Sequence, residues 1–120
     1  MTVRIALELP SFDTGEYEGF EYLMREGGSV LTVKLSKSPS VAIAFKRTRW
    51  HRFTQLHNCE ARWINEAYFR LVEVDAAESL DAYVQADTSS KQPYNELRHY
   101  RIFLDESGCH EVFAESAQFL

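Results

Sequence analysis

Apolar and polar residues alternate along the start of this chain, which is the pattern of a half-buried β-strand. The apolar positions of this first strand are Val3, Ile5, Leu7 and Leu9. The strand is expected to end before Pro10, because proline has no N–H to give to a ladder.

Two adjacent glycines predict a β-hairpin next. Gly27 and Gly28 lie between the apolar segments 20–25 and 30–35, and glycine adopts the positive φ angles that tight hairpin turns need. The segment 41–53 begins as an apolar run and continues as a basic and aromatic one. We interpret it as a single strand that completes a three-stranded meander.

Three further strands are predicted in the second half, over residues 68–74, 97–104 and 109–114. The last two flank the turn sequence Asp-Glu-Ser-Gly at 105–108, which favours a second hairpin. Residues 57–63 fit either a loop or a short helical turn.

One helix is predicted, from Asp75 to about Gln85. Asp75 is a good N-cap residue, and Glu78 three positions later completes a capping box. Behind the cap, apolar residues recur at helical spacing on one face.

These elements predict a single α+β domain spanning residues 1–120. The expected architecture is a curved antiparallel sheet of six or seven strands, built from a meander and hairpins, with one main helix packed on it. At 120 residues, 45% of them hydrophobic, the chain is long enough to bury its own core.

Charge is sorted along the chain, whose formal net charge is -5. Residues 25–52 carry seven basic side chains and a single acidic one, Glu26. From Glu60 onward, twelve acids stand against five bases. Such sorting predicts a surface with regions of opposite sign, which favours charged partners.

A basic and aromatic stretch, residues 45–53, is the first candidate site. Its members could bind nucleic acid, because cations neutralise phosphates and aromatic rings stack on bases; these residues are Lys46, Arg47, Arg49, Trp50 and Arg52. We favour the alternative that the cations protect a sheet edge or pair with the chain's own carboxylates, because the whole chain is acidic. Nucleic acid is therefore an unfavoured partner.

Acidic and aromatic residues form the second candidate site, a surface for a basic protein. Carboxylates that complement a basic partner raise the association rate, and aromatic side chains anchor such contacts. The residues that we expect to bind this partner are Glu16, Tyr17, Glu18, Asp81, Tyr94 and Glu106.

The sequence contains no clear motif for a catalytic site or a metal site. His57 and Cys59 are close in sequence, but no second pair at zinc spacing accompanies them, and we expect no metal and no cofactor. A contact between His99 and Cys109 across the last hairpin is a further alternative, but buried thiols are usually inert. We therefore expect no enzyme, although a ligand carrier or small enzyme with a pocket in the curved sheet stays an alternative.

The chain's beginning predicts a cytoplasmic protein. Glu8 lies where a signal peptide would be apolar, and no segment has the length and hydropathy of a membrane span. The two cysteines, Cys59 and Cys109, are expected to be reduced thiols.

Two short motifs, Tyr17-Glu18-Gly19-Phe20 and Leu97-Arg98-His99-Tyr100, together with the strand at 68–74 and its following helix, give a layout that resembles small bacterial β-rich proteins of the toxin-immunity type. The resemblance implies an inhibitor that occludes the active site of a secreted toxin. It carries no functional residue over to this chain. A homodimer that joins the basic strand to the acidic face stays a further alternative.

Overall fold

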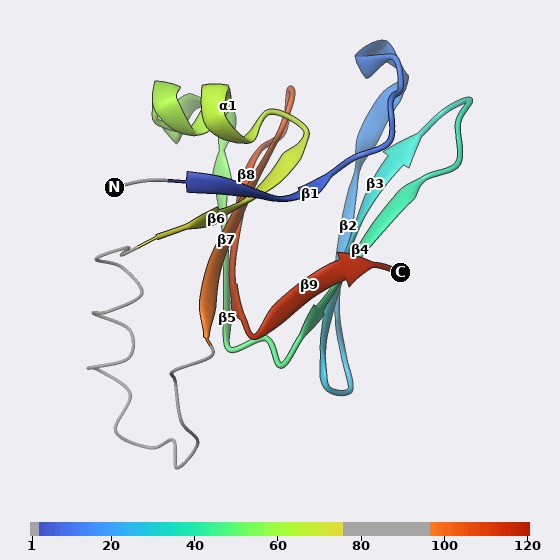
Figure 1. Cartoon of the computed structure of the whole chain (residues 1–120). Helices are drawn as coiled ribbons and strands as arrows, with labels where there is room; N and C mark the ends of the chain where they lie inside the picture. The colour runs from blue at the N-terminus through green and yellow to red at the C-terminus, as the bar shows by residue number, and fades with distance from the viewer. Residues whose placement is uncertain (1–2, 76–96) are drawn as a thin grey trace.

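The computed structural model describes residues 3–75 and 97–120 and shows two antiparallel β-sheets packed face to face (Figure 1). One sheet has five strands in the order β1-β6-β7-β8-β5, and the other has four in the order β2-β3-β4-β9. The bounds of the strands are β1 Val3–Glu8, β2 Tyr17–Arg25, β3 Gly28–Leu35, β4 Val41–Lys46, β5 Trp50–Gln55, β6 Arg70–Val74, β7 Arg98–Leu104, β8 Gly108–Ala114 and β9 Ser116–Phe119.

The α+β class is confirmed, but the expectation of one curved sheet with six or seven strands is wrong. The described residues form nine strands in two sheets, and the predicted strand 41–53 is in fact two strands. Arg47 has a φ of 53°, a left-handed conformation that interrupts the extended backbone after β4. The chain then crosses to the other sheet, where the Arg49 N–H donates to the Phe113 carbonyl at 2.8 Å.

A later crossing, which was not predicted, returns the chain to the four-stranded sheet. It occurs at Glu115, between β8 and β9, and the Glu115 N–H donates to the Lys46 carbonyl at 2.9 Å. The Arg47 Nε lies 3.2 Å from the Glu115 Oε2, so an ion pair joins the two crossings. β9 escaped prediction because it has only four residues, and only Ala117 among them is partly buried.

Both predicted hairpins are present. β2 and β3 are joined by Glu26 and Gly27, and β7 and β8 pair in register around the turn at 105–107. Gly28 is needed for close approach, because a Cβ at this position would lie 1.8 Å from the Phe45 carbonyl oxygen.

The first strand lies where it was predicted, but its alternation fails. A bulge between Ile5 and Leu7 shifts the register of β1 on β6, and Ile5 is 51% exposed. The ambiguous segment 57–63 contains the 3-10 helix η2, Leu56–Asn58, and the start of the helix α1, Ala61–Ala67.

The space between the sheets is filled by apolar side chains. The fully buried members of this core include Leu31, Ile43, Leu71, Ile102 and Leu104, which come from both sheets. A smaller cluster covers part of the outer face of the five-stranded sheet, where Trp63 and Ile64 of α1 pack against Phe103 and Cys109. The fold is therefore a two-layer sandwich with its larger core between the two sheets.

The predicted helix from Asp75 to about Gln85 lies, beyond Asp75, outside the described residues. Within residues 3–75 and 97–120, no helix combines the length and the hydropathy that crossing a bilayer requires.

Candidate protein-binding surface

The start of β2 is joined to the turn between β7 and β8. The Tyr17 Oη lies 2.6 Å from the Ser107 Oγ, a hydrogen bond between residues 90 positions apart. The Tyr17 ring also packs edge-on against Phe69, with the ring centroids 5.4 Å apart. Tyr17 is thus half-buried, and burial raises the pKa of its phenol above the ordinary value. Both contacts of Tyr17 are with residues of this protein, so its role here is to hold the start of β2 against the turn between β7 and β8.

The four described members of the predicted partner-binding set lie on the two segments that this bond joins; they are Glu16, Tyr17, Glu18 and Glu106. Glu18 is exposed in β2, and Glu106 is exposed in the turn that carries Ser107. The other two predicted members, Asp81 and Tyr94, lie outside the described residues. We call the end of the sandwich that carries the four residues the acidic end.

Glu16 has partners of its own. Its Oε1 accepts hydrogen bonds from the backbone N–H groups of Lys37 and Ser38, at 3.1 and 2.7 Å, and its Oε2 accepts one from the Ser38 hydroxyl at 3.2 Å. These bonds, the Ser38 hydroxyl foremost, lower the pKa of the Glu16 carboxyl. Glu16 therefore stays charged and fixed in place, holding the turn after β3 against the 3-10 helix η1, Thr14–Glu16.

A surface hollow of about 330 Å³ opens beside the acidic end. Its apolar wall comes from Phe20 of β2 and Phe53 of β5, whose ring centroids are 5.1 Å apart. Glu106 and Ser107 lie on its rim, and Leu56 and His57 of η2 complete its lining. No local pattern predicts this hollow, because it arises where the edge strands β2 and β5 of two different sheets meet.

Below the hollow, two histidines and a tyrosine join the sheets. The His51 ring stacks on Tyr22, with centroids 3.8 Å apart, and the His51 Nε2 shares a hydrogen bond of 2.9 Å with the His110 Nδ1. Burial and the neighbouring His51 lower the pKa of His110 to about 3, so both rings are uncharged in this contact at neutral pH. Tyr22, His51 and His110 therefore form a polar contact between the two sheets, whose other facing side chains are mostly apolar.

The outer face of the five-stranded sheet holds a buried charge cluster centred on Glu111. Its Oε2 accepts from His99 at 2.7 Å and from Arg101 at 3.2 Å, and its Oε1 accepts from Arg52 at 2.5 Å. Although burial raises it, the bonds from His99 and Arg52 outweigh this effect and bring the pKa of Glu111 to about 2. Glu111 thus neutralises part of the basic stretch identified in the sequence.

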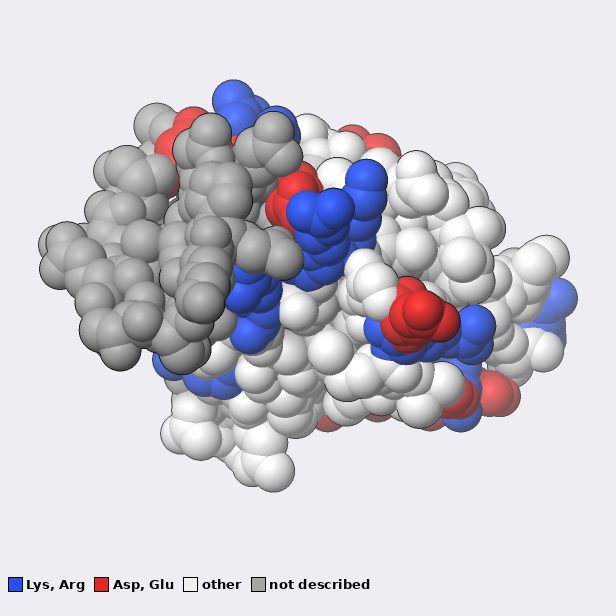
Figure 2. Space-filling model, turned by 90° about the horizontal axis from the view of Figure 1, so that it is seen from below, with Lys and Arg blue, Asp and Glu red and all other residues white. Residues whose placement is uncertain are grey.

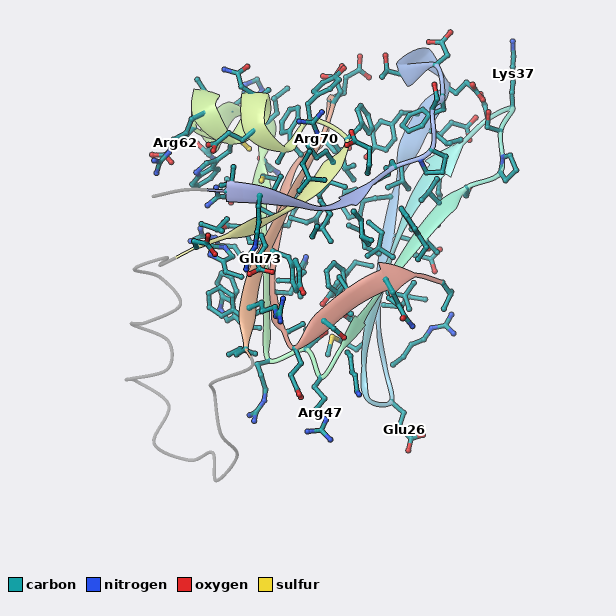
Figure 3. The ribbon with its side chains drawn as sticks, viewed as in Figure 1. Glu26, Lys37, Arg47, Arg62, Arg70 and Glu73 are labelled. Atoms are coloured by element: carbon teal, nitrogen blue, oxygen red, sulfur yellow. The ribbon has the colours of Figure 1, made fainter. Side chains whose placement is uncertain are left out.

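The residues of the basic stretch do not share one face. Trp50 stacks on Phe113, with ring centroids 4.4 Å apart, and Arg52 belongs to the Glu111 cluster. Lys46, Arg47 and Arg49 lie at the crossing between the sheets, where Arg25, Arg47 and Arg49 line a hollow of about 460 Å³. Figure 3 shows Arg47 and Glu26 at this lower end and Lys37 at the opposite one. Seen from below, Lys and Arg side chains gather in several groups with acids among them (Figure 2).

The contact between His99 and Cys109 considered from the sequence is absent. The register pairs His99 with Phe113 and Cys109 with Phe103, which places the two side chains at opposite ends of the hairpin. Both cysteines are free thiols, and burial raises the pKa of Cys109 far above its ordinary value, which makes it a poor nucleophile. In the part of the chain that the structure describes, no group of three or more His, Cys, Asp or Glu could hold a metal ion.

No protein-family model matches the chain, and neither the curated proteins nor the solved structures include a significant match to it. The surface itself is therefore the basis for a functional interpretation.

Proposed function

We propose that this protein is a cytoplasmic binding domain that neutralises a basic protein partner by covering its active site. The observation that carries the proposal is the acidic end, where the Tyr17–Ser107 bond places the segment of Glu16 and Glu18 next to the turn that carries Glu106, beside a hollow walled in part by Phe20 and Phe53. Charges beside a hollow with aromatic side chains suit protein recognition, because the hollow accepts an anchoring side chain while the charges guide the approach.

The mode of inhibition that we infer is occlusion, as for an immunity protein that blocks a secreted toxin. A toxin that acts on an anionic substrate presents basic groups at its active site, and the acidic end offers carboxylates to those groups. Glu18 and Glu106 are exposed and available for such pairing, whereas Glu16 and Tyr17 hold the surface in shape.

The burial of His99 and Cys109 argues against the ligand-carrier and enzyme alternative. That alternative requires a pocket inside the sheet lined by His99 or Cys109, and both side chains are almost fully buried. The surface hollows described above do not include either residue in their lining. A protein-binding role needs only a surface, which the sandwich supplies.

The proposal is tested by capture from the native host followed by an activity assay. The tagged chain is expected to recover one basic protein at a one-to-one ratio and to abolish that protein's activity when mixed with it at equal concentration. Failure to recover any stoichiometric protein would contradict the proposal. So would a captured partner whose activity is unchanged in the complex.

A further inference from the structure

We propose that β2 is the docking strand for the partner, which adds an extended, basic segment of its own to the free edge of the four-stranded sheet. This inference rests on the proposed function and specifies how the partner is held. It starts from the position of β2, which pairs only with β3 among the described strands and lies at one end of the order β2-β3-β4-β9.

The register identifies which backbone groups of β2 are free. Arg25 pairs with Gly28 across a two-residue turn, so this pair exchanges hydrogen bonds, and the alternation of an antiparallel ladder fixes the rest. The N–H and C=O groups of Phe20, Tyr22 and Met24 therefore point away from β3. Among the described residues, no backbone group of another segment bonds to them.

Among the four sheet edges that the described strands form, β2 is the least protected. Natural edges avoid unwanted pairing through bulges, charged side chains (lysine most often), proline or short length. β1 has a bulge at Ile5 and is followed by Pro10, β5 carries Arg52, and β9 has only four residues. β2 has nine residues and contains no lysine or proline. Its bulge lies at its start, between Tyr17 and Gly19.

Exposed side chains define the partner's chemistry. Leu23 and Met24 are 43% and 64% exposed near the end of β2, and Glu18 and Glu21 precede them. An added strand would place its residues directly opposite these, so cations facing the acids and apolar side chains facing Leu23 are favoured. On the inner side, alternate residues of the added strand would point toward the hollow at Phe20 and Phe53.

A second copy of this chain is a poorer occupant. In an antiparallel pairing of two β2 strands centred on the middle of each, Glu21 would lie opposite its own copy, and like charges directly opposite one another destabilise a sheet. A basic segment avoids this repulsion and gains the attraction of the acidic end. We therefore assign the edge to a partner strand.

The test uses a nine-residue peptide of alternating lysine and valine, and the same peptide with methyl groups on alternate backbone nitrogens. Titration into the isotope-labelled chain, followed by NMR hydrogen exchange, is expected to slow exchange of the Phe20, Tyr22 and Met24 amides by at least about tenfold. The methylated peptide is expected to lose this effect. Absence of binding, equal binding of both peptides, or protection elsewhere in the chain would overturn the assignment.

The variant Met24→Pro blocks the edge without removing a bond to β3, because the Met24 N–H points outward. Met24→Ala is the matched control. We expect Met24→Pro to lose peptide binding at least about tenfold while Met24→Ala retains it. If Met24→Pro instead converts a dimer to a monomer in sedimentation, the occupant is a second copy and the assignment is wrong. If it leaves capture of a host partner intact while charge reversal at the acidic end abolishes capture, strand addition fails and the proposed function stands.

Discussion

Arg52 and Glu111 face each other across the β5–β8 ladder, and their side chains are joined by a hydrogen bond of 2.5 Å. This pair links the basic and the acidic parts of the sequence within a single sheet. The Glu111 side chain is only 1% exposed and also receives His99 and Arg101, whereas the Arg52 side chain is 48% exposed. Part of the segregated charge of this chain therefore stabilises the fold.

Replacing Glu111 by Gln is expected to destabilise the protein strongly. The change leaves the buried guanidinium of Arg101 without its carboxylate, and breaking a buried ion pair typically costs about 3–5 kcal/mol. The matched control is Glu115→Gln, which breaks the ion pair with the exposed Arg47 and should cost less than about 1 kcal/mol. Urea unfolding followed by tryptophan fluorescence measures both. Equal costs would show that the Glu111 cluster has no special role in stability.

Stability is expected to fall in acid in two stages. The pKa of His110 is about 3 in the folded protein against 6.5 ordinarily, so the unfolded chain takes up the proton first and stability declines as pH falls below about 6.5. Glu111, whose pKa is about 2 against 4.5, adds its loss only below about pH 4.5. The variant His110→Phe removes the larger part of the first stage and leaves the contribution of His51, so its free energy of unfolding should change by roughly 1–2 kcal/mol less between pH 6.5 and 4.5. Parallel curves for the two proteins would contradict this assignment.

Gly28→Ala is expected to be among the most damaging single changes in the first hairpin. Its Cβ would overlap the Phe45 carbonyl oxygen of β4, so the β3–β4 ladder would have to open, at a cost of at least about 2 kcal/mol. Gly19→Ala has nothing within 4 Å of its Cβ and carries only the strain of its positive φ, about 1 kcal/mol. The melting temperatures of the two variants, measured by thermal unfolding, compare the two costs. A smaller effect at Gly28 than at Gly19 would show that the close approach is readily relieved.

Weak or no binding to nucleic acid is expected. The cations of the basic stretch are divided between the sheet crossing and the Glu111 cluster, and the Trp50 ring is stacked on Phe113, where it is not free to stack on a base. A gel-shift assay at low salt with single-stranded and double-stranded probes checks this. A shift that weakens linearly with the logarithm of salt concentration and disappears in the variant Arg47→Glu/Arg49→Glu would establish the alternative function.

Local patterns predicted the hairpins well, because turn residues and alternation are properties of neighbouring positions. Gly27 and Gly28 marked the first turn, and the segment 105–108 marked the second. The division into two sheets was missed, because it depends on the left-handed backbone at Arg47, and arginine gives no sign of that conformation. Similarly, the meeting of Phe20 with Phe53 and of Tyr17 with Ser107 depends on long-range packing that no local pattern encodes.

The binding constant of the captured partner tests the central claim most directly. It is measured at low and high salt for the natural chain, for the charge-reversed variant Glu18→Lys/Glu106→Lys, and for the control Glu26→Lys, which lies at the opposite end of the molecule. We expect the double variant to lose at least about a hundredfold in affinity at low salt and the control less than about threefold, with the difference shrinking at high salt. Equal losses in the double variant and in Glu26→Lys, or a loss that salt does not change, would contradict binding through the acidic end.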